Sequence, residues 1–140
     1  MAPPAKVLVV ANRTADSDEL HAALVGRAQD GPIDVTLVAP AAWEVVDPHG
    51  DRQSALRRLN AALTRLAAAG ITAKGVVGDA DPVAAVQDIW DAERFDEVIV
   101  ATLPHQLSRW LGLDLPHRVE RLTGLPTRHV IASERSAVAR

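Results

Sequence analysis

The chain contains no cysteine, which excludes disulfide bonds, thiolate metal sites and a catalytic thiol. Aromatic residues are also scarce, with one phenylalanine, three tryptophans and no tyrosine in 140 residues. Because 48% of the residues are nevertheless hydrophobic, the expected core is aliphatic and rich in alanine. A chain of this length buries roughly two thirds of its unfolded surface, which suffices for one domain.

Long hydrophobic runs and blocks of like charge are missing as well. No segment approaches the ~20 apolar residues that a membrane-spanning helix needs, and residues 1–6 (MAPPAK) lack the pattern of a signal peptide. The expected location is therefore the cytoplasm. The net charge is -3 with both signs interspersed, so we expect no nucleic-acid partner. The five histidines show no metal-binding spacing, and no metal is expected.

Five short hydrophobic segments alternate with segments of helical periodicity. The expected strands are residues 6–11, 34–39, 72–77, 96–101 and 128–132. This alternation predicts an α/β fold, namely a doubly wound, five-stranded parallel sheet with helices on both faces, which is Rossmann-like. Residues 1–132 are expected to form a single domain, followed by a flexible C-terminal tail at residues 133–140.

Helix boundaries carry more specific signals. Asp16 with Glu19 has the spacing of a reciprocal cap, and Asp81 followed by Pro82 marks another helix start. A helix over residues 54–70 is predicted to turn a stripe of leucines inward, at Leu56, Leu59, Leu63 and Leu66. Residues 40–52 are expected to form a long loop.

In open parallel sheets, ligands bind beyond the carboxyl ends of the strands, near the point where strand order reverses. The candidate ligand-binding residues are Asn12, Arg13, Thr14, Val38, Ala39, Gly78, Asp79, Thr102, His105, Ser108 and Arg109. This rule identifies one edge of the sheet and leaves the activity open.

Three segments resemble the universal stress protein family: ANRTADS (11–17), GDADPVAAVQDIWDAERFDEVIVA (78–101) and GLPTRHVIA (124–132). The resemblance covers nearly the whole chain. It implies a five-stranded α/β fold of the adenine nucleotide alpha-hydrolase-like type, a homodimer and, in part of the family, ATP binding. The last strand, from Thr127 to Ala132, is expected to lie at a sheet edge and to pair with its twin, since an open edge exposes unpaired backbone groups.

ATP-binding members of that family carry Gly-x-x-Gly after strand four, then Gly-Ser or Gly-Thr about nine residues further on. Glycines let the backbone approach the phosphates, whose charge is then met by N–H groups. Here Thr102 and His105 stand at the first two glycines, Asp114 stands at the Ser or Thr, and Asn12 replaces the family's Asp. We therefore expect no cofactor held in the family's ATP mode, although ATP or AMP bound in another way stays open.

Three functional interpretations follow. The first is a non-catalytic, dimeric, stress-related sensor of a small anionic or nucleotide-like ligand, with arginine side chains in place of the glycine loop. The alternative is a protein-interaction module without a small-molecule ligand, which exposes helix and loop surfaces to another protein. Residues 107–113 (LSRWLGL) are then interpreted as a packing helix, with Leu107, Trp110 and Leu111 inside, rather than as a ligand loop. A third interpretation, an enzyme using His105 and Ser108, lacks an identifiable group to orient the base.

Overall fold

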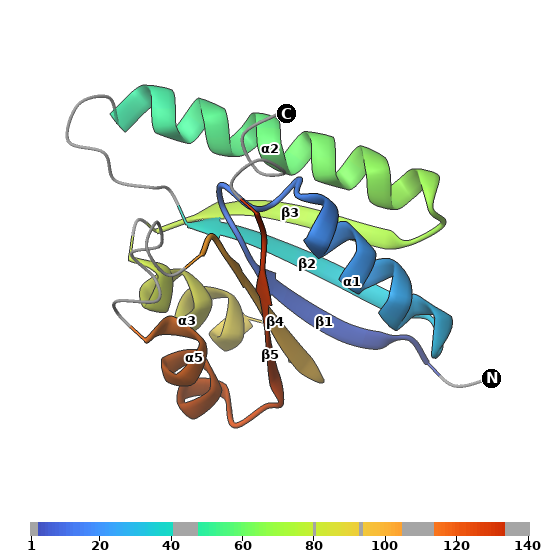
Figure 1. Cartoon of the computed structure of the whole chain (residues 1–140). Coiled ribbons are helices and arrows are strands. Elements are labelled where there is room, and N and C mark those ends of the chain that lie inside the picture. The colour runs from blue at the N-terminus through green and yellow to red at the C-terminus, as the bar shows by residue number, and fades with distance from the viewer. Residues whose placement is uncertain (1–2, 41–47, 80, 93, 105–113, 134–140) are drawn as a thin grey trace.

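The computed structural model describes residues 3–40, 48–79, 81–92, 94–104 and 114–133 (Figure 1). Its centre is a parallel sheet of five strands in the order β3-β2-β1-β4-β5. The strands are β1 (Ala5–Val10), β2 (Ile33–Pro40), β3 (Thr72–Gly78), β4 (Glu97–Thr102) and β5 (Thr127–Ile131). The predicted fold class is confirmed, and each strand lies within about one residue of its predicted range at either end.

Helices cover both faces of the sheet. The helices α1 (Asp18–Gln29) and α2 (Pro48–Ala68) pack on one face, and α3 (Pro82–Ala92) and α5 (Leu115–Thr123) pack on the other (Figure 1). Successive strand residues point to opposite faces, so Val9 joins the first core and Leu8 the second. Both are fully buried. The strands are hydrophobic along their whole length because helices cover both of their faces.

The helix α2 differs from its prediction in two ways. It begins at Pro48, so the expected loop over residues 40–52 is wrong for its last five positions. Of the predicted stripe, Leu59 and Leu66 are buried and Leu63 packs partly buried against the same core, whereas Leu56 is 43% exposed. The buried residues of α2 that face the sheet are Ala55, Leu59, Ala62 and Leu66. These four positions follow the i, i+4, i+7, i+11 pattern of one helix face, and Leu56 lies one residue, about 100°, away from it.

The start of α1 also differs from its prediction. The N-cap is Ser17, whose Oγ accepts a hydrogen bond of 3.2 Å from the backbone N–H of Leu20. Asp16, the predicted cap, instead directs its carboxylate to a side chain of α2. The predicted cap of α3 is confirmed, because Asp81 Oδ1 accepts a hydrogen bond from the N–H of Val83 at 3.0 Å.

Candidate functional site

Strand order reverses between β1 and β4. The helix that follows β1, which is α1, lies on one face of the sheet. The helix that precedes β5, which is α5, lies on the other face (Figure 1). Ligands of open parallel sheets bind at such a reversal, outside the carboxyl ends of the strands. Four candidate residues stand there in the structure, namely Asn12, Arg13, Thr14 and Thr102.

Asn12 joins three elements at this edge. Its side chain is 4% exposed, and its Nδ2 donates a hydrogen bond of 2.6 Å to the carbonyl oxygen of Pro40 at the end of β2. Its Oδ1 accepts one of 2.6 Å from Nη2 of Arg58 on α2, while Nε of Arg58 donates to the Asn12 carbonyl at 3.1 Å. Both polar atoms of the Asn12 side chain, Nδ2 and Oδ1, are thus hydrogen-bonded, and these bonds fix the loop after β1.

Thr14 attaches the same loop to β4. The residue is 2% exposed, and its hydroxyl donates a hydrogen bond of 3.0 Å to the carbonyl oxygen of Ala101. This bond crosses the boundary between β1 and β4, where the strand order reverses. At this edge of the sheet, the Thr14 hydroxyl is therefore bonded to the protein itself.

Thr102 connects the end of β4 to the edge strand β5. Its hydroxyl donates to the carbonyl oxygen of Leu103 at 2.9 Å, and its oxygen lies 2.7 Å from Nε2 of His129. Because the hydroxyl proton is directed at Leu103, the His129 ring donates from Nε2. Burial lowers the pKa of His129 below its usual 6.5, so the ring is neutral at pH 7.

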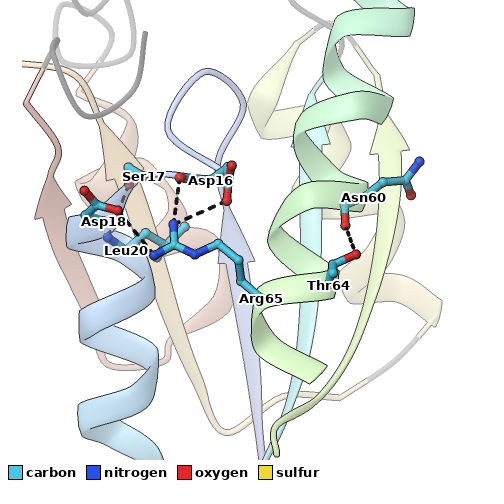
Figure 2. A network of polar contacts seen from close by, with 7 residues as sticks. All are labelled: Asp16, Ser17, Asp18, Leu20, Asn60, Thr64 and Arg65. Carbon is cyan, nitrogen blue, oxygen red and sulfur yellow. Dashed lines mark hydrogen bonds and ion pairs between the residues drawn. The ribbon is translucent and has the colours of Figure 1, made fainter. Parts of the chain in front are cut away.

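A second arginine of α2 holds the far end of the loop. Figure 2 shows Arg65 reaching from α2 to the residues that precede and open α1. Its Nη1 donates to the carbonyl oxygen of Asp16 at 3.1 Å and lies 3.4 Å from Asp16 Oδ1, and its Nη2 lies 3.2 Å from Asp18 Oδ1. Arg58 and Arg65 stand seven positions apart on one side of α2. Together they clamp the β1–α1 loop at both ends.

Sequence reasoning missed these two arginines, although a signal was available. Each directly precedes a leucine of the buried stripe, Leu59 or Leu66. An arginine in that position flanks the packed face and can reach a neighbouring loop with its guanidinium. No role was expected for either arginine.

Arg13 is the candidate whose charge remains available. It is exposed, and it makes no hydrogen bond or ion pair with any other residue within the described ranges. It lies between Asn12 and Thr14, whose side chains are anchored on β2 and β4. The loop therefore presents a guanidinium at the edge of the sheet from an otherwise fixed backbone.

The candidates on β2 and β3 have structural roles. Val38 and Ala39 are fully buried in the two cores. A methyl group at Gly78 would lie 2.8 Å from Cβ of Ala85 on α3, closer than two non-bonded carbon atoms can approach. The absence of a side chain at Gly78 therefore allows α3 to pack this closely against β3. Asp79 Oδ1 accepts a hydrogen bond from the N–H of Asp81 at 2.8 Å and fixes the turn before α3.

The candidates His105, Ser108 and Arg109 lie outside the described residues. Asp114, which opens the next described segment, stands at the N-cap position of α5 with a φ of 55°, in the left-handed region. Its side chain makes no capping hydrogen bond; Oδ2 lies 3.3 Å from Nδ1 of His117 instead. A carboxylate thus stands at the start of α5, where the resemblance would place a phosphate-binding Ser or Thr.

A shallow cleft of about 270 Å³ opens at the amino ends of β4 and β5, between Arg27, Glu97 and Arg128. Nε of Arg27 and Oε1 of Glu97 form an ion pair of 2.9 Å across it. The cleft lies opposite the edge where parallel sheets bind ligands, so it is a separate feature. No trio of histidine and acidic side chains in the described part of the chain is grouped as metal ligands are. None of the described helices has the length and hydrophobicity to cross a membrane.

Solved structures that are similar to this chain include universal stress proteins. One from Archaeoglobus fulgidus is 15% identical, covers 90% of this chain and 93% of its own, and superposes with a TM-score of 0.63. The A. fulgidus protein in complex with dAMP gives 13% identity, 93% and 99% coverage, and a TM-score of 0.64. A universal stress protein in complex with cAMP gives 23% identity, 94% and 100% coverage, and a TM-score of 0.59.

No protein-family model and no curated protein sequence matches the chain. The agreement therefore concerns the fold, which spans nearly the full length of both partners in each comparison. This chain has the universal stress protein fold.

Proposed function

We propose that this chain is a divergent universal stress protein that acts as a non-catalytic, homodimeric binding protein. Its ligand is small and anionic or nucleotide-like, and it binds at the carboxyl end of the sheet, where β1 and β4 diverge. The observation that carries the proposal is the match of the whole fold to proteins solved with dAMP and cAMP. Both of those ligands are adenine nucleotides with a single phosphate.

The loop after β1 supports a monophosphate ligand. Asn12 and Thr14 fix the loop from both sides, so the backbone that carries Arg13 needs no ordering on binding, and only the side chain is immobilised. A guanidinium can donate two parallel hydrogen bonds to a phosphate or a carboxylate. One such contact suits a nucleotide with one phosphate better than it suits a triphosphate.

The elements that would hold a triphosphate in the family's usual way argue against ATP. Thr102, at the position of the first glycine, is buried with its hydroxyl bonded to Leu103 and His129. Asp114 brings a carboxylate to the N-terminus of α5, where it repels an anion that the helix dipole would otherwise favour. We therefore propose a ligand of the AMP class, and no ATP in the usual mode.

Native mass spectrometry and calorimetry with AMP, dAMP, cAMP and ATP test this proposal. We expect retention of a monophosphate, with ATP bound more weakly. Replacing Arg13 by alanine removes a charged hydrogen bond worth about 1.5–3 kcal/mol, and so weakens monophosphate binding roughly 10- to 100-fold. The matched control is Arg121→Ala, an exposed arginine at the far end of α5. Tighter binding of ATP than of AMP, or equal effects of the two substitutions, would contradict the proposal.

A second candidate, a protein-interaction module without a small-molecule ligand, is favoured by one observation. The three buried polar side chains at this edge, those of Asn12, Thr14 and Thr102, all bond to the protein itself. If none of the four nucleotides binds at millimolar concentration and Arg13→Ala still changes the capture of a partner protein, this second function replaces the first.

A further inference from the structure

The cleft at the amino ends of β4 and β5 lies on the face of the sheet that α1 covers. Glu97 precedes the buried Ile99 by two positions on β4, and Arg128 is the residue of β5 that pairs with Ile99. Side chains alternate between the two faces along a strand, and paired residues share a face. Because Ile99 belongs to the core beneath α1 and α2, the side chains of Glu97 and Arg128 stand on that face too. Arg27, from the last turn of α1, lines the cleft beside them.

Two guanidinium groups in this cleft have hydrogen-bond donors to spare. Nε of Arg27 donates to Oε1 of Glu97 at 2.9 Å, and neither Nη atom of Arg27 bonds to another of the described residues. The edge formed by the two Nη atoms can donate a pair of parallel hydrogen bonds to an anion. Arg128 is exposed and makes no hydrogen bond or ion pair within the described ranges. Because Glu97 holds Arg27 in place, the donor edge of Arg27 is oriented before a ligand binds.

The charges around the cleft favour a ligand with a single negative charge. Its lining contains two arginines and one glutamate, which leaves one positive charge in excess. The hydrogen bond to Glu97 raises the pKa of Arg27, and the nearby charge of Asp30, the C-cap of α1, adds to this rise. Two carboxylates therefore lie near Arg27, and they repel an anion that carries more than one charge. A phosphate group carries about -1.5 to -2 charges at pH 7, whereas a carboxylate carries one and matches the planar guanidinium.

The size of the cleft and the rest of its lining favour a short hydrophobic body on that carboxylate. The volume of about 270 Å³ lies just below the roughly 300–1,000 Å³ of sites for drug-sized ligands. It exceeds the ~150 Å³ of a cavity that holds one benzene molecule. Ile99 and Pro126 contribute apolar atoms to the lining next to the charged side chains. A group of about the size of benzene that bears one carboxylate therefore fits the cleft.

We propose that this cleft is a binding site for a small monocarboxylate with a hydrophobic body, held by Arg27 and Arg128. The carboxylate accepts hydrogen bonds from the Nη edge of Arg27 and from the guanidinium of Arg128, and the hydrophobic body lies against Ile99 and Pro126. The site is at the amino ends of the strands, whereas Arg13 follows β1 at the carboxyl edge. The inference therefore goes beyond the proposed function and does not rest on it.

Benzoate is the probe, and its binding to the full chain is followed by amide NMR titration. We expect saturable shifts at Val98, Thr127 and Arg128, with a dissociation constant on the order of a millimolar, as is usual for so small a ligand. Benzamide has the same body without the charge and should bind about tenfold more weakly or worse. Inorganic phosphate should also bind more weakly than benzoate. The site is overturned by equal binding of benzamide, by tighter binding of phosphate, or by the absence of saturable shifts at tens of millimolar benzoate.

Three variants test the two arginines. Arg128→Ala removes an exposed charged donor and should weaken benzoate binding roughly tenfold. Arg27→Lys keeps a cation beside Glu97 but lacks the paired donors, and should weaken binding about fivefold. The control Arg121→Ala, on α5 and therefore on the other face of the sheet, should change nothing. Equal effects of Arg128→Ala and Arg121→Ala overturn the site, and undiminished binding by Arg27→Lys overturns the role of Arg27. Because Arg128 is exposed, its replacement keeps the test valid even if Arg27→Lys fails to fold.

Arg13→Ala separates this inference from the proposed function. It should leave benzoate binding unchanged, and Arg128→Ala should leave AMP binding unchanged, because the two arginines lie at opposite edges of the sheet. Benzoate binding that depends on Arg13 as much as on Arg128 overturns the inference. If benzoate binds as expected and AMP does not, only the proposed nucleotide site fails. If AMP binds and benzoate does not, only the inference fails.

Discussion

The clamp between Arg58 and Asn12 gives the most direct test of how the loop after β1 is held. We consider Arg58→Met, which keeps most of the aliphatic stem and the helix propensity while removing the guanidinium. The substitution deletes the 2.6 Å bond to Asn12 Oδ1 and the 3.1 Å bond to the Asn12 carbonyl. Hydrogen bonds that involve a charged group contribute about 1.5–3 kcal/mol each when well shielded. Arg58 is only half-buried, so we expect a loss of about 2 kcal/mol in the free energy of unfolding.

Asn12→Ala should cost a similar amount, about 2–3 kcal/mol, because it leaves the buried Pro40 carbonyl without its amide donor. The two substitutions remove one shared interaction. The double variant should therefore lose at least about 1 kcal/mol less than the sum of the single losses. Urea denaturation followed by circular dichroism measures all three, with an unchanged m-value as evidence that the unfolded state is unaltered.

Arg57→Met is the matched control for this cycle. Arg57 lies on the same turn of α2, but among the described residues its side chain bonds only to Ser54 within the helix. Its replacement should leave the stability nearly unchanged. If Arg58→Met is no more harmful than Arg57→Met, or if the losses at Arg58 and Asn12 are additive, the loop is not held by this clamp.

Three further predictions concern packing and titration. Gly78→Ala should destabilise by about 1–3 kcal/mol, because the new methyl group meets Ala85 at 2.8 Å, whereas Gly26→Ala, with open space around it inside α1, should stabilise by up to about 1 kcal/mol; thermal unfolding compares the two. Leu59→Ala should cost about 2–5 kcal/mol in urea and Leu56→Ala far less, since Leu59 is buried and Leu56 is not. Burial lowers the pKa of His129, so the folded state binds fewer protons than the unfolded one, and the stability should fall as the pH drops below about 6.5; His129→Gln should flatten that part of a urea-midpoint profile.

The fold was predictable because its signals are local. The hydrophobic strands and their alternation with helices follow from the sequence period, and the Asp81–Pro82 start of α3 follows from capping chemistry. The start of α2 was mispredicted because Gly50 was interpreted as part of a loop, although Pro48 has the residue type favoured at a first helical position. For α1, two adjacent residues could each cap the helix. Arg65 binds Asp16, and Ser17 is left as the cap.

The placement of the candidate residues in the fold was predictable from the sequence, whereas their bonds within the protein were not. The rule for parallel sheets put Asn12, Thr14 and Thr102 at the carboxyl edge of the sheet, where the structure has them, and the structure shows all three bonded within the protein as anchors. Their partners could not be read from the sequence. Arg58 lies 46 positions from Asn12, and the carbonyl that Thr14 binds belongs to Ala101, 87 positions away. Such bonds depend on tertiary approach, which local patterns do not specify.

The side chains of Asn12, Thr14 and Thr102 bond within the protein, and this affects how a ligand would be recognised. The loop after β1 is held by α2 and β4 before any ligand arrives. Binding therefore need not order the loop, and no binding free energy is lost in ordering it. Specificity then depends on groups that are still free to bond, and among the described residues at this edge Arg13 is the cationic side chain that no described residue binds. An anion bound at the proposed site would meet a guanidinium on a rigid loop. Such a site favours a planar, bidentate contact with a single phosphate or carboxylate over the enclosure of a triphosphate.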